Sequence, residues 1–224
     1  PTQTAVQKYH NAKKVPQLFL ATGASKWNDP KEFPWTMGWQ PNYQSETQIY
    51  AKYILKNHPN AKIAVLYQND DLGRDYITGL KSGLGDKAAS MIVAEDSFET
   101  SEPSIDNHIV KLKASNADVF VDIATPKFAA QAIKKVAELG WKPTFFLTST
   151  ATSVASVMRA AGVEHSQGII SVAYLKDPTD PRWSDDPGQK EFSAWMKKYQ
   201  PNASPGDLFN VQGYTVAQVM TAVL

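Results

Sequence analysis

Short apolar runs alternate with helical patterns along most of the chain. The runs are rich in β-branched and aromatic residues and nearly continuous, which is typical of strands buried on both faces of a sheet. They predict strands at residues 17–21, 62–67, 90–94, 119–123, 144–147 and 168–173. The segments before and between them show helical periodicity, which predicts helices at residues 4–12, 44–56, 73–84, 103–114, 127–139 and 152–161.

This alternation determines the expected fold class. Strands separated by helices of this length pair in parallel through right-handed crossovers. Gly140 and Gly162 follow two of the predicted helices, at the C′ position that favours glycine. The chain is therefore predicted to be an α/β protein with a doubly wound parallel sheet.

Two stretches interrupt the alternation. Residues 25–44 contain three tryptophans and three prolines without a helical period, and residues 175–192 are rich in proline and aspartate. Either stretch alone is consistent with a surface loop. Because together they flank the central strand–helix block, we expect them to be crossings between two lobes.

Both ends of the chain fall inside predicted elements. The sequence begins at Pro1, in a pattern that resembles the middle of a strand–helix unit, and residues 213–224 stop inside an apolar helical pattern. We expect the sequence to be an internal piece of a longer protein. A missing signal peptide then carries no information about export.

Composition narrows the function classes. The chain has 224 residues and a formal net charge of +1, and its basic residues form no stripe, which disfavours nucleic acid and anionic membranes as partners. It contains no cysteine, which excludes disulfides, thiolate nucleophiles and cysteine metal sites. No apolar run reaches the length of a transmembrane helix.

Small polar residues gather where the predicted strands end. In an open α/β sheet, ligands bind beyond the carboxyl ends of the strands. Here those ends carry mostly hydroxyl or amide groups, as in "LFLATGAS" and "FFLTSTAT", at residues 22–25, 68–72, 124–125, 148–150 and 173–174. Such groups also cap helices, and we favour the capping interpretation for Asp71 and Thr152.

The sequence contains no recognised catalytic motif. It lacks a G-x-S-x-G elbow, a Walker loop and an H-E-x-x-H pattern. Asp70, Asp71 and Asp75 could bind a metal ion or supply a general base, but acidic residues here more often favour the positive end of a helix. The histidines lie in polar or helix-end surroundings that indicate surface positions, at residues 10, 58, 108 and 165. We therefore expect no enzyme, no metal and no cofactor.

Five segments, taken together, carry a resemblance to a known family: "KKVPQLFLATGAS", "NYQSETQIYAKYIL", "KIAVLYQNDDLGRDY", "ADVFVDIATPKFAAQAIKKVAELGW" and "LFNVQGYTVAQVM". They resemble the substrate-binding proteins of ABC importers of the branched-chain amino acid type, which have the type I periplasmic binding fold. The resemblance covers nearly the whole chain in order. Within that family, the sequence is more similar to members that import aromatic carboxylates than to the amino-acid binders.

The resemblance implies a two-lobed protein with an incomplete first lobe. Residues 1–39 would form part of the first lobe, residues 40–191 the second lobe with hinge crossings at both ends, and residues 192–224 a return to the first lobe. It also implies a periplasmic monomer that binds a small carboxylate and docks on a membrane permease. Two alternatives remain open: a branched-chain amino acid as the ligand, and a ligand-sensing receptor domain of the same fold.

The ligand contacts of the family transfer to positions in this sequence only through the resemblance. The backbone and hydroxyl of a first-lobe loop, at Gly23, Ala24 and Ser25, would grip the ligand carboxylate. Leu72 stands where amino-acid binders have a tyrosine, and another of their aromatic contacts falls near Ala124 or Thr125. Strand-end position adds Asp71 to the candidates, and aromatic character adds Phe209, which would either pack a hinge or wall a ligand cavity.

Thr150 is the most informative departure from the family pattern. Amino-acid binders place there the acidic residue that pairs with the ammonium group of the ligand. A buried ammonium without this counter-charge would be costly by several kcal/mol. The neutral hydroxyls of "LTST" therefore favour an aromatic or aliphatic acid over leucine.

Overall fold

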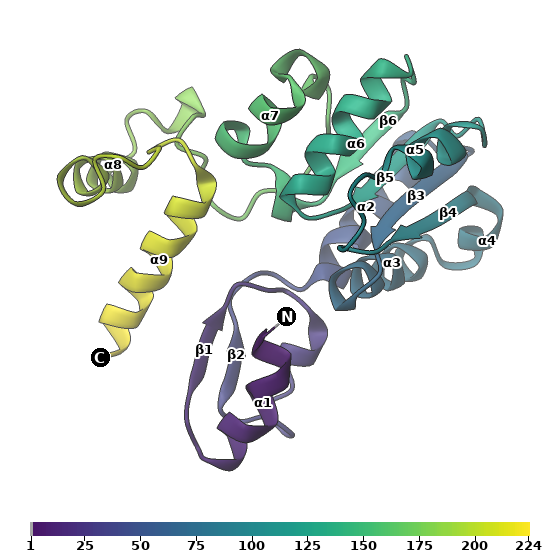
Figure 1. The fold of residues 1–224 in the computed structure, drawn as a ribbon. Coiled ribbons are helices and arrows are strands. Elements are labelled where there is room, and N and C mark those ends of the chain that lie inside the picture. Colours follow the sequence, from purple (N-terminus) through teal and green to yellow (C-terminus); the bar gives the residue numbers. More distant parts are fainter. Residues whose placement is uncertain (1) are drawn as a thin grey trace.

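A four-stranded parallel sheet organises the centre of the chain in the computed structural model, which describes residues 2–224, with side chains from residue 5 onward (Figure 1). Its strand order is β4-β3-β5-β6, with every neighbouring pair parallel. The strands are β3 (Ile63–Gln68), β4 (Ile92–Phe98), β5 (Val119–Ile123) and β6 (Thr144–Leu147).

Helices cover both faces of this sheet. On one face, α2 (Tyr43–Asn57) and α3 (Asp71–Leu84) pack with alternate residues of β3 and β5. On the other, α5 (Asp106–Lys113) and α6 (Pro126–Glu138) pack with the intervening residues. Each fully buried aliphatic or aromatic side chain contributes about 1.5–3 kcal/mol to stability. The predicted α/β class with a doubly wound parallel sheet is confirmed.

The strand order creates a switch point between β3 and β5. From β3 the chain crosses to β4 at one edge and then returns through α5 to β5 on the opposite side of β3. The loops that follow β3 and β5 therefore diverge at the carboxyl edge of the sheet, the place where open α/β folds bind ligands. The sequence placed residues 68–72 and 124–125 at these ends, and the structure agrees.

The N-terminal segment forms a second, smaller sheet. After α1 (Thr2–Ala12), strand β1 (Gln17–Leu20) pairs in parallel with β2 (Thr36–Gly38), and the short 3₁₀ helix η1 (Ser25–Trp27) lies between them. The sequence analysis found no helical period in residues 25–44 and did not predict the strand β2 within them. A three-residue strand flanked by prolines is too short to show a period of two. Its strand geometry comes from pairing with β1.

Two sequence predictions near β6 need correction. Residues 168–173 do not form a strand, because only Ile170 bridges to Phe146, with hydrogen bonds from Leu147 N to Ile170 O and from Ile170 N to Phe145 O. The predicted helix at residues 152–161 is a π-helix, η4 (Val154–Met158), followed by one turn, α7 (Arg159–Ala161). The first pattern therefore gives a single bridge instead of a strand, whereas the second does give a helix at residues 154–161, most of it with π geometry.

The strand predicted at residues 90–94 is shifted. The short helix α4 (Ala88–Met91) occupies its start, and β4 continues to Phe98. The second half of β4 contains polar residues, so the apolar pattern did not predict that the strand continues to Phe98. Polar residues are tolerated there because β4 lies at the edge of the sheet. The predicted ends of two helices agree with the structure. Gly140 and Gly162 follow α6 and α7, and both have positive φ.

Two C-terminal helices lie apart from the central sheet (Figure 1). The irregular stretch at 175–192 passes into α8 (Pro187–Tyr199), and α9 (Leu208–Val223) follows. They share a small core of Phe192, Met196 and Val211. Within residues 2–224, no helix has both the length and the apolar character required to cross a membrane. The lobe boundaries at 39/40 and 191/192 stay predictions.

Candidate ligand site

The ends of β3 and β5 meet through a pair of polar side chains. Gln68 closes β3 and is buried, and its Oε1 accepts a hydrogen bond of 2.8 Å from the hydroxyl of Thr125, which follows β5. The amide of Gln68 in turn donates to the carboxylate of Asp70. Of the two candidates after β5, Ala124 is fully buried in the core on the α5/α6 face. Thr125 is the one that places a polar group at the switch point.

The loop after β1 is held tightly against the start of α2. Gly23 is buried, and its carbonyl accepts a 3.0 Å hydrogen bond from Tyr43 N. A Cβ at this position would lie 2.0 Å from the carbonyl oxygen of Pro41 and 2.8 Å from the Tyr43 ring, so only glycine fits. The N–H of Ala24 donates to the hydroxyl of Thr22 at 3.2 Å. The close contact of Gly23 with Pro41 and Tyr43 therefore fixes the backbone of the loop that leads to Ser25.

Ser25 already holds a carboxylate in this structure. Its N–H donates to Asp75 Oδ2 at 2.5 Å, and its hydroxyl donates to Asp75 Oδ1 at 2.9 Å. The side-chain amide of Gln44 donates to the same Oδ1 at 2.9 Å. Asp75 lies on α3, so these bonds join the loop after β1 to a helix that packs on the central sheet.

The neighbouring acidic residues have different roles from those expected. Asp70, not Asp71, is the N-cap of α3, and its Oδ1 accepts from Gly73 N at 3.2 Å. Asp71 is exposed and pairs with the ammonium of Lys26. The capping interpretation was therefore wrong for Asp71. Leu72 is partly buried and packs against the core beneath α2 and α3.

Thr152 also does not cap a helix N-terminus. Its hydroxyl donates to Ser149 O at 3.0 Å, and it closes the 3₁₀ turn η3 (Ser149–Ala151) as the C-cap. Thr150, in the middle of this turn, is half-buried and shares a 3.2 Å hydrogen bond with the hydroxyl of Thr148. The run of hydroxyls after β6 is therefore partly satisfied internally, and Thr150 lies at its partly exposed end.

A buried carboxylate that sequence reasoning missed lies against this turn. Glu46 on α2 accepts hydrogen bonds from Ser149 N at 2.7 Å, Ser149 Oγ at 2.6 Å, Tyr50 OH at 2.8 Å and Tyr76 OH at 3.0 Å. Burial raises the pKa of Glu46, while these donors act in the opposite direction. Because protein groups supply four donors, Glu46 has little capacity left for a ligand.

Tyrosines surround Glu46. The rings of Tyr43 and Tyr76 stack with centroids 4.5 Å apart, and burial raises the pKa of Tyr50 and Tyr76 well above the ordinary value. Burial and the nearby Tyr43 and Glu46 raise the pKa of Tyr174 to about 12. A sequence signal did exist, because Glu46 lies four residues before Tyr50 on the apolar face of a predicted helix.

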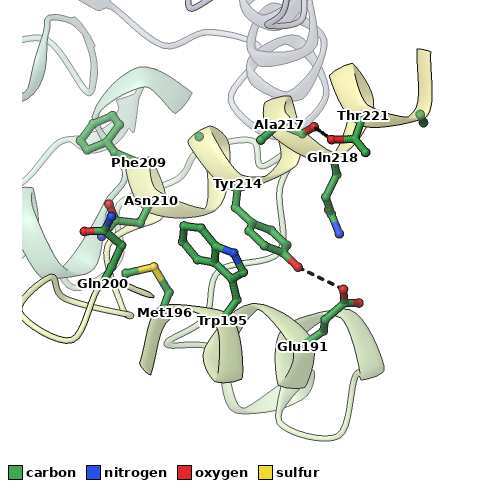
Figure 2. A pocket seen from close by; sticks show the side chains of 12 residues that line it. Glu191, Trp195, Met196, Gln200, Phe209, Asn210, Tyr214, Ala217, Gln218 and Thr221 are labelled. Carbon is green, nitrogen blue, oxygen red and sulfur yellow. Dashed lines mark hydrogen bonds between the residues drawn. The ribbon is translucent and has the colours of Figure 1, made fainter. Parts of the chain in front are cut away.

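Phe209 lies apart from the other candidates. It sits in the first turn of α9, is 43% exposed, and lines a cavity of about 810 Å³ between α8 and α9. Figure 2 shows this cavity, with Trp195 and Tyr214 facing it and Tyr214 bonded to Glu191 at 3.2 Å. None of the other candidate residues lines it. Two hydrogen bonds connect this region to the segment after β6, because the hydroxyls of Ser153 and Ser156 donate to Asp207, the N-cap of α9, at 3.0 and 3.4 Å.

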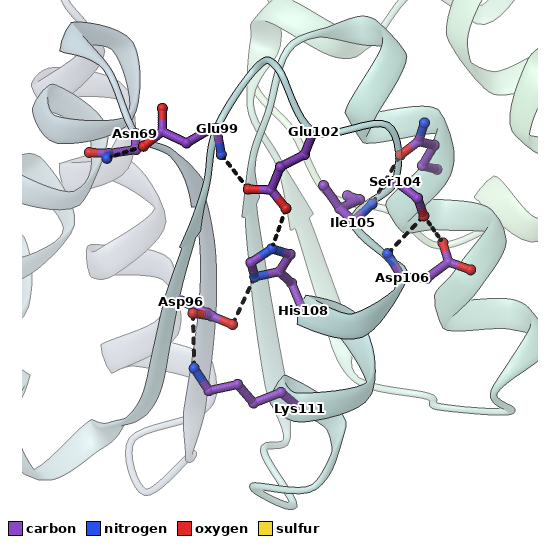
Figure 3. Close-up of polar contacts among 10 residues, drawn as sticks. Asn69, Asp96, Glu99, Glu102, Ser104, Ile105, Asp106, His108 and Lys111 are labelled. Carbon is purple, nitrogen blue, oxygen red and sulfur yellow. Dashed lines mark hydrogen bonds and ion pairs between the residues drawn. The ribbon is translucent and has the colours of Figure 1, made fainter.

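His108, expected at the surface, is instead partly buried. Its side chain is 20% exposed, and its two ring nitrogens lie 2.9 Å from Asp96 and 3.0 Å from Glu102 (Figure 3). Lys111 also pairs with Asp96, at 3.0 Å. Among the residues that the structure describes, no group of three or more acidic, histidine or cysteine side chains is arranged to hold a metal ion.

Sequence comparison identifies the family. The model for the family described as periplasmic binding protein matches residues 1–224, the whole chain. The chain belongs to the periplasmic binding protein family. Its parallel α/β architecture is the type I fold of that family, as the sequence resemblance implied. A search of curated proteins finds no significant match.

Solved structures of periplasmic binding proteins share this fold. A substrate-binding periplasmic protein from Ralstonia solanacearum has a TM-score of 0.83 at 24% identity, over 96% of this chain and 59% of that one. A branched chain amino acid ABC transporter from Thermus thermophilus with bound valine has a TM-score of 0.80 at 14% identity, over 97% and 55%. An ABC transporter solute binding protein from R. palustris in complex with 4-hydroxybenzoate has a TM-score of 0.78 at 19% identity. The match covers 98% of this chain and 58% of that one. The chain thus spans under two thirds of these relatives and only part of the two-lobed fold.

Proposed function

We propose that this protein is the solute-binding component of an ABC importer and that it captures a small carboxylate, preferably an aromatic acid, between two lobes. Family membership supports solute binding, and two of the similar structures come from ABC transport systems. The protein makes and breaks no bond in its ligand. It works in the periplasm as a monomer and delivers the ligand to a membrane permease.

The observation that carries the proposal is the way Ser25 binds a carboxylate. Its N–H and its hydroxyl each donate to a different oxygen of Asp75. Two donors in this arrangement match the two oxygens of any carboxylate, and hydrogen bonds to an ionised acceptor are roughly twice as strong as neutral ones. Ser25 therefore has the donor geometry that a ligand acid needs, in the loop where the family resemblance places it.

The groups after β6 support an acid over an amino acid. A ligand ammonium needs a carboxylate with unused acceptor capacity, because an unpaired buried charge is costly. Thr150 offers only a hydroxyl, and Glu46, the acidic group that contacts this turn, is saturated by Ser149, Tyr50 and Tyr76. Among the remaining candidates, Thr125 supplies a hydroxyl and Leu72 apolar surface, whereas Ala124 is buried in the core.

Closure follows from the two-lobed arrangement that the family implies. A ligand that contacts both the Ser25 loop and the α3 side of the cleft favours the closed form, because it gains contacts there that the open form lacks. Asp71 would contribute at the rim of this cleft, where it already pairs with Lys26. Phe209 lines the separate cavity between α8 and α9, so it has no part in the proposed closure.

The ligand class is open to a direct test. Isothermal titration calorimetry of the full-length protein with benzoate, 4-hydroxybenzoate, leucine and valine should give binding for the aromatic acids, and the Ser25→Ala variant should weaken it at least tenfold. Tight binding of leucine or valine with none of the acids would establish the alternative, a branched-chain amino acid importer. That alternative is favoured by the valine complex among the similar structures.

A further inference from the structure

The carboxylate that Ser25 holds in this structure belongs to the protein itself. We propose that Asp75 is a specificity-determining residue that competes with the acid group of the ligand for Ser25. The inference rests on the proposed function, because it concerns the same carboxylate-binding donors. It assigns to Asp75 a role that is neither ligand contact nor helix capping.

The contacts of Asp75 account for this role. It is half-buried in the second turn of α3, and its two oxygens accept three hydrogen bonds, from Ser25 N, Ser25 Oγ and Gln44 Nε2. Ser25 itself is exposed, so a ligand can reach the donors that Asp75 occupies. Fifty residues separate the two side chains in sequence, so the contact exists only because the loop after β1 folds against α3.

Two ionised carboxylates do not share one set of donors. Like charges at hydrogen-bonding distance disfavour each other, and one of them must move away or take up a proton. A ligand acid therefore has to displace Asp75 from Ser25. Only a group with comparable hydrogen-bonding strength can do so, and neutral esters and amides lack that strength.

The exchange also couples recognition to the arrangement of the two segments. Asp75 joins the loop after β1 to α3 when no ligand is present, beside the ion pair of Lys26 with Asp71. Once the ligand occupies Ser25, this direct link is lost and the ligand itself has to bridge the two segments. Asp75 thus favours ligands that contact both sides over those that reach Ser25 alone.

Asp75→Asn tests the inference, because asparagine keeps the size of the side chain but removes its charge. Titration calorimetry of the full-length protein with benzoate and 4-hydroxybenzoate should show at least tenfold tighter binding for this variant. In a Ser25→Ala background the gain from the same substitution should be smaller, because the shared hydroxyl is gone and Ser25 N–H is the one donor of this residue left to compete for. Asp75→Ala serves as a second variant, with folding of each checked by circular dichroism.

Glu95→Gln is the matched control. It also neutralises one carboxylate that contacts α3, through a 2.7 Å ion pair with Lys81, but it lies on β4, away from Ser25. Acid affinity should be unchanged in this variant. An equal gain in Glu95→Gln would mean that net charge, and not competition at Ser25, controls binding, and it would overturn the inference.

The other outcomes separate the inference from the proposed function. If the wild type binds the acids and Asp75→Asn binds them equally, the inference fails while the proposed function stands. If Asp75→Asn binds the acids and the wild type does not, both are supported. If neither protein binds an acid, and leucine or valine binds only when Asp75 is intact, then Asp75 is an ammonium contact and both fail.

Discussion

Ser149 donates both its backbone N–H and its hydroxyl to the buried carboxylate of Glu46, at 2.7 and 2.6 Å. This relationship ties the turn after β6 to α2, across 103 residues of sequence. Tyr50 and Tyr76 donate to the same carboxylate, so four donors converge on one buried acid. The turn that carries Thr150 therefore takes its position from an acidic residue on another element.

Glu46→Ala should lower the free energy of unfolding by about 2–4 kcal/mol, because it leaves several buried donors without an acceptor. Equilibrium unfolding in urea measures this change. Glu138→Ala is the control, since Glu138 forms only exposed ion pairs on α6 and its loss should cost less than about 1 kcal/mol. Similar losses in both variants would show that the four donors to Glu46 add nothing to stability.

Gly23→Ala should disrupt the loop before Ser25. The new methyl group would overlap the carbonyl of Pro41, and relieving such overlap typically costs about 1–3 kcal/mol. We expect a lower melting temperature and weaker acid binding. Gly213→Ala in α9, where no atom beyond the neighbouring helix backbone lies within 4 Å of the added Cβ, should instead be neutral or stabilising. A Gly23→Ala protein with unchanged stability would contradict the close packing of this loop.

His108 should make stability depend on pH. Partial burial alone would lower its pKa, but hydrogen bonds and charges from Glu102 and Asp96 raise the pKa above its ordinary value. The folded state therefore binds the proton more tightly, and the stabilisation is fully present below about pH 6.5 and lost as pH rises through the raised pKa. Unfolding measured from pH 5 to 9 should show this loss in the wild type and a flatter profile in His108→Gln.

Glu102→Gln provides an independent check on the same cluster. The variant keeps the imidazole but removes one of its two carboxylates, so the pKa of His108 should fall in an NMR titration. The backbone N–H of Glu99, which donates to Glu102 at 2.7 Å, should keep an acceptor in the glutamine side chain. If the titration of His108 does not move, the carboxylates do not control its protonation.

Asp122 should destabilise the protein as pH rises. It is fully buried in β5, neither of its side-chain oxygens has a hydrogen-bond partner among the described residues, and burial raises its pKa well above the ordinary value. The unfolded chain releases this proton near pH 4, whereas the folded protein retains it, so stability falls from about pH 4 toward the raised pKa.

Replacing Asp122 tests whether stability falls as pH rises because of this carboxyl group. Asp122→Val removes an unpartnered polar group from the core and should raise the free energy of unfolding at pH 7 by about 1–3 kcal/mol. Asp122→Asn should flatten the dependence on pH without improving the packing. Unfolding in urea at pH 5, 7 and 9 distinguishes these effects. Loss of stability in both variants at every pH would show that the carboxyl has a partner in solution.

The core of the fold was predictable because its signal is local. Continuous apolar runs at β3, β5 and β6 and helical periods at α2, α3 and α6 reflect burial on both faces of one sheet. β2 was not predictable, because three residues gain strand geometry only from pairing with β1. The pattern at residues 168–173 failed for the converse reason, since Ile170 alone bridges to β6.

The candidate site likewise contains residues that the sequence predicted and residues that it did not. The resemblance and the strand ends placed Gly23, Ser25 and Thr125 in loops, and the structure brings Thr125 to Gln68 at the switch point. Glu46 and Asp75 were missed as site residues, because each contacts the site from a helix that is distant in sequence. The spacing of Glu46 and Tyr50 along α2 indicates that Glu46 is buried, but no spacing indicates that it contacts Ser149 or that Asp75 contacts Ser25.

The amino-acid sequence by itself determined the class of fold, the carboxyl edge where polar groups gather, and the supply of neutral hydroxyls there. These properties depend on which residues are apolar and at what period, which a linear pattern records. Only the tertiary structure decided the partners of those hydroxyls, because a hydrogen bond depends on distances of about 3 Å between atoms that chain order does not bring together. For that reason Ser25 and Ser149, similar in sequence context, hold two different carboxylates, Asp75 and Glu46.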